Sequence, residues 1–277
     1  MAKKRNRSYG RGSTGAGAGK DARTEGGSAS GSPSGSGRTG RGAKKEAPEG
    51  SSELREWIKS LGVAVVLFLI LRTFIVGTFV ITSGSMEDTL LVGDFLVVNR
   101  MAIGSRVPGT DARIPGYSSP RRGDVLVFDP PHEEDLKLVK RLIGLPGDMV
   151  EMRDKVLYLN GEAQEEPYLR LEDPPGEGDD YHPWMEWQRD HLAAGIDGSS
   201  YQPTRDNWGP LVVPEGTYFM LGDNRDSSLD SRYWGPLDDW RLEARALFKY
   251  FSYNKESTYP FAWIREIRWS QIGRGIR

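Results

Sequence analysis

Three short segments of the chain carry hydroxyl, amine, carboxylate and guanidinium groups at close spacing. They are Ile81–Leu90 (ITSGSMEDTL), Leu138–Asp148 (LVKRLIGLPGD) and Gly222–Gly235 (GDNRDSSLDSRYWG). Each segment alone has a structural explanation, because Ser-Gly-Ser and Leu-Pro-Gly-Asp are typical turn sequences and an Asp/Arg-rich run is typical of a salt-bridged loop. Together they supply a hydroxyl nucleophile, a group able to take its proton, and charged residues to support both.

Histidine, the usual base for a serine nucleophile, is poorly placed in this sequence. The chain has three histidines, of which His132 lies in a Pro-Pro-His-Glu-Glu loop. His182 and His191 fall in a stretch that looks like an insertion. None of the three has a local sequence that would hold it beside a serine, although neighbours in space cannot be derived from sequence. The base must therefore be sought among other residue types.

Lys140 is the candidate base. A lysine can take a serine proton if burial lowers its pKa from ~10.4 towards neutrality, since desolvation disfavours the ammonium. Leu138 and Leu142 share the face of Lys140 on a predicted strand and would supply the apolar surroundings. Arg141 is predicted to point to the opposite side and to stay solvated.

The three segments resemble those of bacterial type I signal peptidases, a family of serine proteases. That family has a Ser-Gly-Ser-Met box after its membrane anchor, a Lys-Arg-x-x-Gly-Leu-Pro-Gly-Asp box and a Gly-Asp-Asn-Arg-Asp-x-Ser-x-Asp-Ser-Arg-Tyr-x-Gly box. A fourth box of the family, similar to Arg-Gly-Asp-Val-Val-x-Phe, is present as RGDVLVF at 122–128. The resemblance covers about residues 55–160 and 208–250.

The resemblance implies a role for each matching residue. The nucleophile falls on Ser85 and the general base on Lys140. The oxyanion hole falls on the backbone N–H of Ser85 and the hydroxyl of Ser83, and the hydroxyl that orients the lysine falls on Ser228. The residues that support the site by ion pairing are Asp223, Asp230 and Arg232. The family's mechanism implies no metal and no other cofactor.

Substrate binding is also implied by the resemblance. An extended peptide would pair its backbone with residues 79–83 on one side and 138–140 on the other. Small side chains, as in Ala-x-Ala, would enter shallow apolar pockets. The residues implied to contact the substrate are Phe79, Ile81, Met86, Leu90, Leu138 and Val139.

Two residues depart from the family's pattern. Thr82 replaces the proline before Ser-Gly-Ser, and Asp88 replaces the proline before Thr-Leu. Loss of the first proline would loosen the strand that enters the site. A carboxylate at Asp88, if it lay close to Lys140, would raise the pKa of the lysine.

Charge is unevenly distributed along the chain. The first 50 residues hold eleven Lys/Arg and four Asp/Glu, which leaves 26 basic and 35 acidic residues after them. This acidic remainder gives no reason to expect nucleic acid as a partner. The tail is rich in Gly and Ser and nearly free of large apolar residues, so residues 1–52 are predicted to be disordered. Cysteine is absent, which excludes disulfides and thiolate metal sites.

An apolar run begins at Ile58, and Arg72 is the only charged residue between positions 60 and 81. Such a run is long enough for a bilayer core, which takes about 20 helical residues. A cleaved secretory signal would start earlier and end in small residues, and a buried core helix is a further alternative. We expect an uncleaved anchor over residues 53–78, with the basic tail cytoplasmic and residues 79–277 outside.

After the anchor the sequence favours strands. The short apolar runs are 94–98, 124–128, 136–143, 155–159, 211–213 and 217–221, each bounded by Gly, Pro, Asp or Asn. Asn160-Gly161 predicts a hairpin with a type I′ turn. Two stretches look like insertions, near 104–120 and 172–208. The predicted fold is mainly β, an antiparallel catalytic domain of signal-peptidase type preceded by one transmembrane helix.

The resemblance therefore implies a membrane-bound serine endopeptidase that removes signal peptides from exported preproteins at the cell membrane. Its expected partners are those signal peptides and the lipid bilayer, while its oligomeric state is left open. Two alternatives remain. One is a catalytically silent, membrane-anchored β module that binds peptides or envelope partners. The other is a Ser/Lys protease of the self-cleaving repressor type, which would carry a DNA-binding helix-turn-helix where this chain has its apolar run.

Overall fold

The computed structural model describes residues 49–106, 110, 112–133, 136–174 and 176–276. Contacts divide the chain into Met1–Ser51 and Ser52–Arg277, and nearly all described residues belong to the second unit. The predicted disordered tail, residues 1–52, lies almost entirely outside the described residues. The predicted domain boundaries near positions 52 and 78 stay predictions.

The apolar run forms one long helix whose last turn changes geometry. Helix α1 spans Glu49–Ile70, the turn η1 (Leu71–Ile75) is π-helical, and the backbone then extends into β1 (Val76–Val80). The stretch Glu53–Ile75 has a mean hydropathy of 2.1 and is long and apolar enough to cross a membrane. None of its most apolar window is buried in the structure, which contradicts the alternative of a buried core helix.

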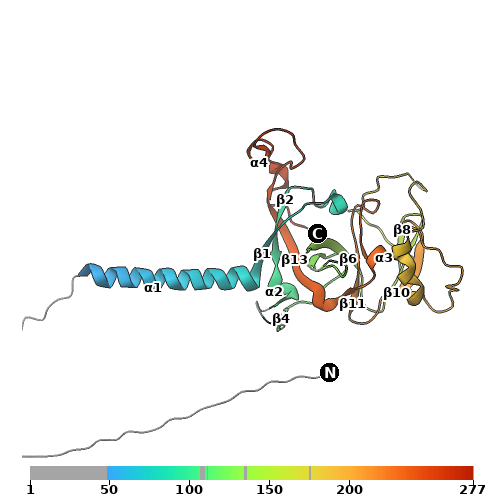
Figure 1. Cartoon of the computed structure of the whole chain (residues 1–277), viewed down its shortest axis with the longest axis horizontal. Helices are drawn as coiled ribbons and strands as arrows, with labels where there is room; N and C mark the ends of the chain where they lie inside the picture. The colour runs from blue at the N-terminus through green and yellow to red at the C-terminus, as the bar shows by residue number, and fades with distance from the viewer. Residues whose placement is uncertain (1–48, 107–109, 111, 134–135, 175, 277) are drawn as a thin grey trace, which may run out of the picture. The chain divides into compact units, whose positions relative to one another are not determined.

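A seven-stranded antiparallel sheet forms the centre of the fold (Figure 1), with the strand order β1-β2-β13-β5-β6-β11-β12. Its strands after β1 are β2 (Asp94–Asn99), β5 (Val125–Phe128), β6 (Leu138–Gly144), β11 (Thr217–Leu221), β12 (Leu237–Asp238) and β13 (Leu242–Ser252). Every neighbouring pair is antiparallel. The predicted mainly β, antiparallel fold class is thereby confirmed.

Burial along the strands follows their sequences. In β2, Asp94, Leu96 and Val98 are buried and the residues between them are only partly covered, as a period of two requires. All four residues of β5 are buried, as expected of a strand covered on both faces. Strand β6 pairs with β5 over Leu138–Arg141 but with β11 only from Arg141 onward. Among the described residues, one edge of its first three residues therefore has no strand partner.

A second sheet of four strands has the order β10-β7-β8-β9. Its strands are β7 (Met149–Arg153), β8 (Val156–Leu159), β9 (Glu162–Ala163) and β10 (Trp208–Val212). Asn160 and Gly161 join β8 to β9 with φ of 52° and 85°. Positive φ at both central positions is the geometry of a type I′ turn, so the predicted hairpin is confirmed.

Both stretches that the sequence marks as insertions contain ordered elements. The first holds the hairpin of β3 (Gly104–Arg106) and β4 (Arg113–Pro115), which follows helix α2 (Arg100–Ile103). The second holds the 3-10 helix η3 (Pro183–His191), whose Met185 is fully buried against the core that includes Trp208 and Phe219. The remaining short helices are η2 (Gly84–Met86), α3 (Ser231–Trp234), η4 (Asp239–Arg241), α4 (Ala262–Arg265) and η5 (Trp269–Gln271).

Candidate active site

The predicted nucleophile Ser85 is the middle residue of η2, a 3-10 helix of one turn that begins directly after the extended residue Ser83. Its side chain is nearly buried, with 8% of the residue exposed. The Ser85 carbonyl accepts a hydrogen bond of 3.1 Å from the backbone N–H of Asn224. The first and third sequence segments therefore meet through their backbones, 139 positions apart, an arrangement that only the tertiary fold creates.

Lys140 reaches the same point from β6. Its Nζ donates a hydrogen bond of 2.5 Å to the Ser85 Oγ, and the lysine is 2% exposed. Direct contact between an amine and a hydroxyl is the geometry that proton transfer requires. On the strand, Leu142 is buried and Leu138 is partly buried, in agreement with the apolar face expected around the amine.

Burial lowers the pKa of Lys140 from 10.5 to about 8, because the ammonium has lost its water. The carboxylates of Asp230 and Asp223 act in the opposite direction, and the Arg232 guanidinium lowers the pKa further. Desolvation is the largest of these effects. The amine is therefore neutral in a substantial fraction of molecules at mildly alkaline pH, which allows it to accept a proton.

Asp230 and Arg232 form a fully buried ion pair, and both charges act on the lysine. Arg232 donates from Nε to Oδ1 at 2.8 Å and from Nη2 to Oδ2 at 2.9 Å. Burial alone would raise the pKa of Asp230, but the Arg232 charge holds it below its usual value. Asp230 also accepts from the backbone N–H of Gly222 at 3.1 Å, so the pair fixes the turn that faces Ser85.

Arg141 is not solvated, and that part of the sequence prediction is wrong. The residue is 1% exposed, and it donates to Asp223 from Nε at 2.8 Å and from Nη2 at 2.6 Å. Its Cζ lies 3.7 Å from the centroid of the Tyr168 ring. The sequence argument placed Arg141 on the opposite face from Lys140 but had no means of placing a carboxylate there. Asp223 thus pairs with Arg141, while Asp230 pairs with Arg232.

Ser83 and Ser228 carry the two other hydroxyls predicted for the site, and they differ in burial. Ser83 is exposed, and its Oγ lies 3.4 Å from the Ser85 Oγ. Ser228 is buried, and its hydroxyl acts on the Asp230 carboxylate and helps to lower the pKa of that group, whereas no hydrogen bond between its Oγ and Lys140 is seen. Its predicted contact with the lysine stays a prediction. Gly222 explains the close packing here, since a Cβ on it would lie 2.1 Å from the Ser228 Oγ and 2.5 Å from the Ser85 carbonyl.

Asp88, one of the two departures from the family's pattern, faces Arg170. Its carboxylate lies 3.3 Å from Arg170 Nη1, and its side chain is 60% exposed. The charged neighbours that shift the pKa of Lys140 are Asp230, Arg232 and Asp223, and Asp88 is not among them. Asp88 also has a φ of 75°, which a proline ring cannot adopt. The local backbone therefore differs from that of a chain with proline at this position.

A cavity of about 180 Å³ opens beside Ser85. Four of the predicted substrate-contacting residues line it, namely Ile81, Met86, Leu138 and Val139. Phe79 and Leu90 do not line it: Leu90 is fully buried, and both belong to the core packing beneath. Val80, Thr82 and Ser83 on its wall belong to the stretch 79–83 that was expected to pair with the peptide, whereas Leu136 and Lys137 were not among the predicted site residues.

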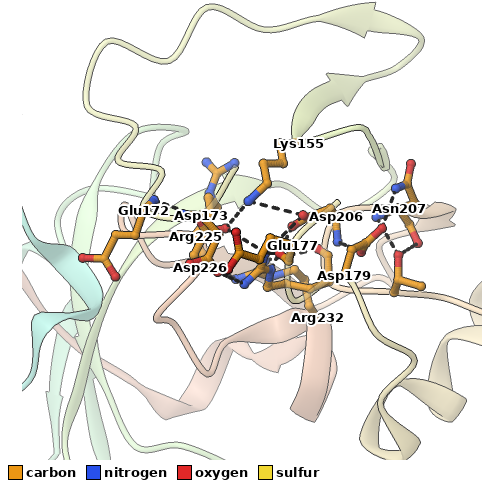
Figure 2. A network of polar contacts seen from close by, with 12 residues as sticks. Lys155, Glu172, Asp173, Glu177, Asp179, Asp206, Asn207, Arg225, Asp226 and Arg232 are labelled. Carbon is orange, nitrogen blue, oxygen red and sulfur yellow. Dashed lines mark hydrogen bonds and ion pairs between the residues drawn. The ribbon is translucent and has the colours of Figure 1, made fainter. Parts of the chain in front are cut away.

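A network of buried charges joins the 172–208 stretch to the third sequence segment (Figure 2). Lys155 Nζ lies 2.6 Å from Asp226 Oδ1 and 3.3 Å from Asp206 Oδ2. The other carboxylate oxygen of Asp226 accepts from the backbone N–H groups of Glu172 and Asp173 at 2.7 and 2.9 Å. These contacts anchor both ends of the insertion to the loop that carries Ser228 and Asp230. Nothing in the sequence pattern indicated this network.

The histidines have other contacts. The His182 Nδ1 accepts from the backbone N–H of Trp184, His191 Nδ1 lies 3.2 Å from the Trp187 carbonyl, and the His132 ring lies 6.4 Å from that of Trp234. Among the residues that the structure describes, no group of three or more His, Cys, Asp or Glu is arranged to hold a metal ion. Within the described part of the chain, Lys140 is the only titratable residue whose side chain hydrogen-bonds to the Ser85 Oγ.

The fold and the site define a class: a mainly β protein in which a buried lysine contacts a serine hydroxyl, as in serine hydrolases that use a lysine base. The chain belongs to the signal peptidase family, peptidase S26, whose family model matches residues 54–251. It is 43% identical over 185 residues to a Signal peptidase I of Pseudomonas aeruginosa, which covers 65% of this chain and 63% of that protein.

A Signal peptidase I of Bacillus licheniformis is 35% identical over 205 residues, covering 74% of this chain and 92% of that protein. Among solved structures, a signal peptidase I of Enterococcus faecalis matches with 32% identity and a TM-score of 0.31, covering 46% of this chain and 97% of that one. The chain spans somewhat less than two thirds of the length of its Pseudomonas relatives, 63% in each case.

The buried Arg141–Asp223 pair generates a prediction about stability. Arg141→Met should lower the free energy of unfolding by ~3–5 kcal/mol, because it leaves an uncompensated carboxylate in the interior. Arg141→Met/Asp223→Leu, which removes both charges, should recover most of that loss. Urea unfolding of the detergent-solubilised chain, followed by tryptophan fluorescence, measures both effects.

The matched control is Arg153→Met. Arg153 also makes a bidentate pair, with Glu151, but its side chain is 59% exposed. An exposed ion pair contributes ~0–1 kcal/mol to the free energy of unfolding, so Arg153→Met should change it little. If Arg141→Met cost no more than Arg153→Met, the Arg141–Asp223 pair would not hold the site together as described.

Proposed function

We propose that this protein is a membrane-bound serine endopeptidase that removes N-terminal signal peptides from exported preproteins. The observation that carries the proposal is the 2.5 Å hydrogen bond between Lys140 Nζ and Ser85 Oγ, made by a buried amine with a pKa of about 8. Membership of the signal peptidase family and relatives named Signal peptidase I support the same function.

The first chemical step forms the tetrahedral intermediate that precedes the acyl-enzyme. Neutral Lys140 takes the proton of the Ser85 hydroxyl while Oγ attacks the carbonyl carbon of the scissile bond. The backbone N–H of Ser85 and the hydroxyl of Ser83, whose Oγ lies 3.4 Å from that of Ser85, donate to the developing oxyanion. One such donor typically lowers the barrier by ~3 kcal/mol.

The second half of the reaction returns the lysine to its starting state. The carbon–nitrogen bond breaks as the Lys140 ammonium gives its proton to the leaving amine, and the signal peptide remains as an ester on Ser85. Lys140 then takes a proton from water, whose oxygen attacks the ester, and the proton returns to Ser85 Oγ as the peptide carboxylate leaves. Ser228, buried close to Gly222, orients the amine during these transfers, and the Asp230–Arg232 pair supports the turn that carries it.

Substrate binds by strand addition. The cavity of about 180 Å³ is lined by residues 80–83 on one wall and 136–139 on the other. The first three residues of β6 have no strand partner on one edge among the described residues, and β1 is the outermost strand of its sheet. An extended peptide can hydrogen-bond to such edges. The small volume between Ile81 and Val139 favours small side chains before the cut, as in Ala-x-Ala.

The enzyme works at the cytoplasmic membrane. Residues 53–75 provide the span, the basic tail stays in the cytoplasm, and the β domain lies outside. Ser85 follows the end of the span by only ten positions, so its site lies near the membrane surface, where the apolar core of a signal peptide is also found. The partners are signal peptides and the lipid bilayer.

The catalytic pair can be tested by substitution. Ser85→Ala and Lys140→Ala should each lower the cleavage of a leader peptide by on the order of 10⁴-fold or more, and combining them should cause little further loss because the two groups act as a unit. Ser83→Ala should lower the rate by ~10²–10³-fold as a lost oxyanion donor. The measurement is kcat/KM for a soluble leader peptide with the detergent-solubilised chain. A chain that binds the peptide but leaves it uncut in wild type would be the silent β module instead.

The pH dependence tests whether Lys140 acts as a neutral amine. Below its pKa the lysine is an ammonium without a lone pair, so kcat/KM should rise with pH along a limb centred near pH 8. Changing His132, His182 and His191 together to Ala should leave that limb in place. Asp88→Asn should also leave it unmoved, since the carboxylate of Asp88 faces Arg170. A limb near pH ~6.5 that disappeared with the histidines would assign the base to one of them.

Topology provides an independent test. Protease added to intact spheroplasts should digest the chain after residue 80 and spare the basic tail, because the lysines and arginines before the span keep that side in the cytoplasm. Epitope tags at the two ends, read by immunoblot, measure which part survives, and lysed cells serve as the control for accessibility. Survival of the C-terminal tag in intact spheroplasts would contradict the proposed orientation.

A further inference from the structure

The backbone carbonyl of Arg232 cannot be satisfied within its own helix. Arg232 lies in α3, a helix of four residues, and the last carbonyls of a helix lack an intrahelical partner. The residue four positions further on is Pro236, which has no backbone N–H, and the N–H of Gly235 is already bonded to the Ser231 carbonyl at 3.1 Å. Arg232 is fully buried, so its carbonyl needs a donor from elsewhere in the fold.

The donors come from the 172–208 stretch. Gln188 of η3 is fully buried, and its Nε2 donates to the Arg232 carbonyl at 2.9 Å. Trp187 donates to the same carbonyl from Nε1 at 3.2 Å, which a carbonyl oxygen with two lone pairs allows. The bond from Gln188 is the shorter of the two and comes from the more deeply buried side chain. The insertion thus satisfies a carbonyl of the loop that faces Ser85.

A second hydrogen bond fixes the orientation of the Gln188 amide. Tyr201 Oη lies 2.6 Å from Gln188 Oε1 and accepts from the backbone N–H of Gly209 at 2.7 Å. Because the Arg232 carbonyl can only accept, the amide must turn its NH2 towards that carbonyl and its oxygen towards the phenol, which donates its single proton. Burial raises the pKa of Tyr201 to about 12, so the phenol keeps this proton at neutral and mildly alkaline pH. The hydrogen bonds therefore run in one direction, from Gly209 to Arg232.

The side chain of Arg232 connects this series of bonds to the catalytic lysine. Its guanidinium makes two hydrogen bonds to Asp230, and its Nη1 and Nη2 also donate to the carbonyls of Arg205 and Arg225 at 3.3 and 2.7 Å. Asp230 raises the pKa of Lys140, and Arg232 lowers it. The position of the pair relative to the amine therefore decides how strongly two opposite charges act on it.

Few other charges act on this part of the structure. Besides burial, the charged groups that shift the pKa of Lys140 are Asp230, Arg232 and Asp223, all from the third sequence segment. Apart from Asp230, the groups that act on the Arg232 guanidinium are Tyr233 and Asp206. Displacement of α3 would therefore be felt at Lys140 chiefly through the Asp230–Arg232 pair.

We propose that Gln188 is a positioning residue for peptide cleavage: by holding the Arg232 carbonyl, it keeps the Asp230–Arg232 pair in the position that allows Lys140 to act as a base. This inference rests on the proposed function. None of the described residues of the 172–208 stretch lines the substrate cavity. The insertion thereby acquires a role in the chemistry without touching the substrate.

The first measurement is the steady-state kinetics of Gln188→Met, which keeps an unbranched side chain and removes both hydrogen bonds of the amide. The kcat for a soluble leader peptide should fall by ~10-fold, since a misplacement of ~1 Å at a distance from the reacting atoms can cost ~10²-fold. The KM should change little, because the substrate cavity is lined by other parts of the chain. The full chain in detergent is used throughout.

The second measurement is the titration of Lys140 itself, by NMR of the chain labelled with 13C at lysine Cε, with Lys140→Ala to assign the resonance. A loosened α3 weakens the effect of Arg232, frees Asp230 to act on the amine and admits water. All three changes favour the ammonium, so the midpoint near 8 in wild type should rise by roughly half a pH unit or more in Gln188→Met. The rising limb of kcat/KM should move to higher pH with it.

Histidines of the insertion are the other titratable groups on this side. The His182 ring centroid lies 5.3 Å from that of Tyr233, and the His191 ring centroid lies 5.2 Å from that of Trp187. The variant that lacks all three histidines should keep the wild-type midpoint of Lys140. A midpoint that moved as far in that variant as in Gln188→Met would assign the shift to histidine and overturn the role of Gln188.

The matched control is Gln164→Met. Gln164 Nε2 also donates to a backbone carbonyl at 2.9 Å, that of Glu162, but at an exposed site. This variant should keep the wild-type kcat and Lys140 midpoint. Tyr201→Phe offers a second route, because it removes the proton that orients the Gln188 amide without changing α3. It should shift the midpoint in the same direction by less, and adding it to Gln188→Met should cause no further loss of kcat.

The outcomes separate a positioning role from a structural one. If kcat and the Lys140 midpoint were the same in Gln188→Met as in Gln164→Met, the proposal would be overturned. A lower melting temperature with kcat per folded molecule and the midpoint unchanged would also overturn it, since Gln188 would then only stabilise the fold. If Gln188→Met did not fold, Tyr201→Phe would decide between the two roles by the same readouts.

The NMR titration also separates this inference from the proposed function, because it requires no cleavage. A raised Lys140 midpoint in Gln188→Met, in a chain whose wild type cut no peptide, would count against the peptidase alone. Cleavage by wild type together with an unshifted midpoint and an unchanged kcat in Gln188→Met would count against the positioning role alone.

Discussion

The burial of one lysine amine beside one serine hydroxyl is the constraint on which the rest of this structure depends. A fall in the pKa of Lys140 from 10.5 to about 8, at 1.36 kcal/mol per pKa unit, corresponds to roughly 3 kcal/mol of lost stability. That cost is present in full below pH 8, where the lysine is protonated in both the folded and the unfolded chain, and it disappears as pH rises through 10.5. The remainder of the fold must therefore supply enough stability to hold the amine in place.

Two buried ion pairs near the amine keep the charges around it compensated. Arg141 holds Asp223 and Arg232 holds Asp230, each with two hydrogen bonds of 2.6–2.9 Å. Because both carboxylates are paired with arginines, their tendency to keep Lys140 charged is smaller than the effect of burial. Asp226 is likewise paired with Lys155, and it accepts a hydrogen bond from the backbone of Glu172 at the start of the 172–208 stretch. The insertion thereby holds the loop that faces the serine.

The membrane helix and the site are coupled by short connections. The π-helical turn after α1 leads directly into β1, and the segment after β1 carries Ser85. In the proposed peptidase, Ser85 therefore follows the end of the apolar stretch by only ten positions. Arg100 of α2 donates to the Thr73 carbonyl at 3.2 Å and follows the strand that pairs with β1, so α2 joins the end of the apolar stretch to the sheet.

The sequence by itself indicated the local features of the protein: an apolar span, a β-rich domain, a serine in a turn and a lysine between leucines on a strand. These follow from local composition and from periods of two and 3.6 residues, which act over a few positions. Tertiary structure decided what depends on partners far away in the chain. It buried Arg141 against Asp223, 82 positions on, turned Asp88 towards Arg170, and placed Leu90 in the core rather than at the substrate cavity. Sequence pattern shows which side of a strand a residue occupies, but only folding shows which charge or void lies opposite it.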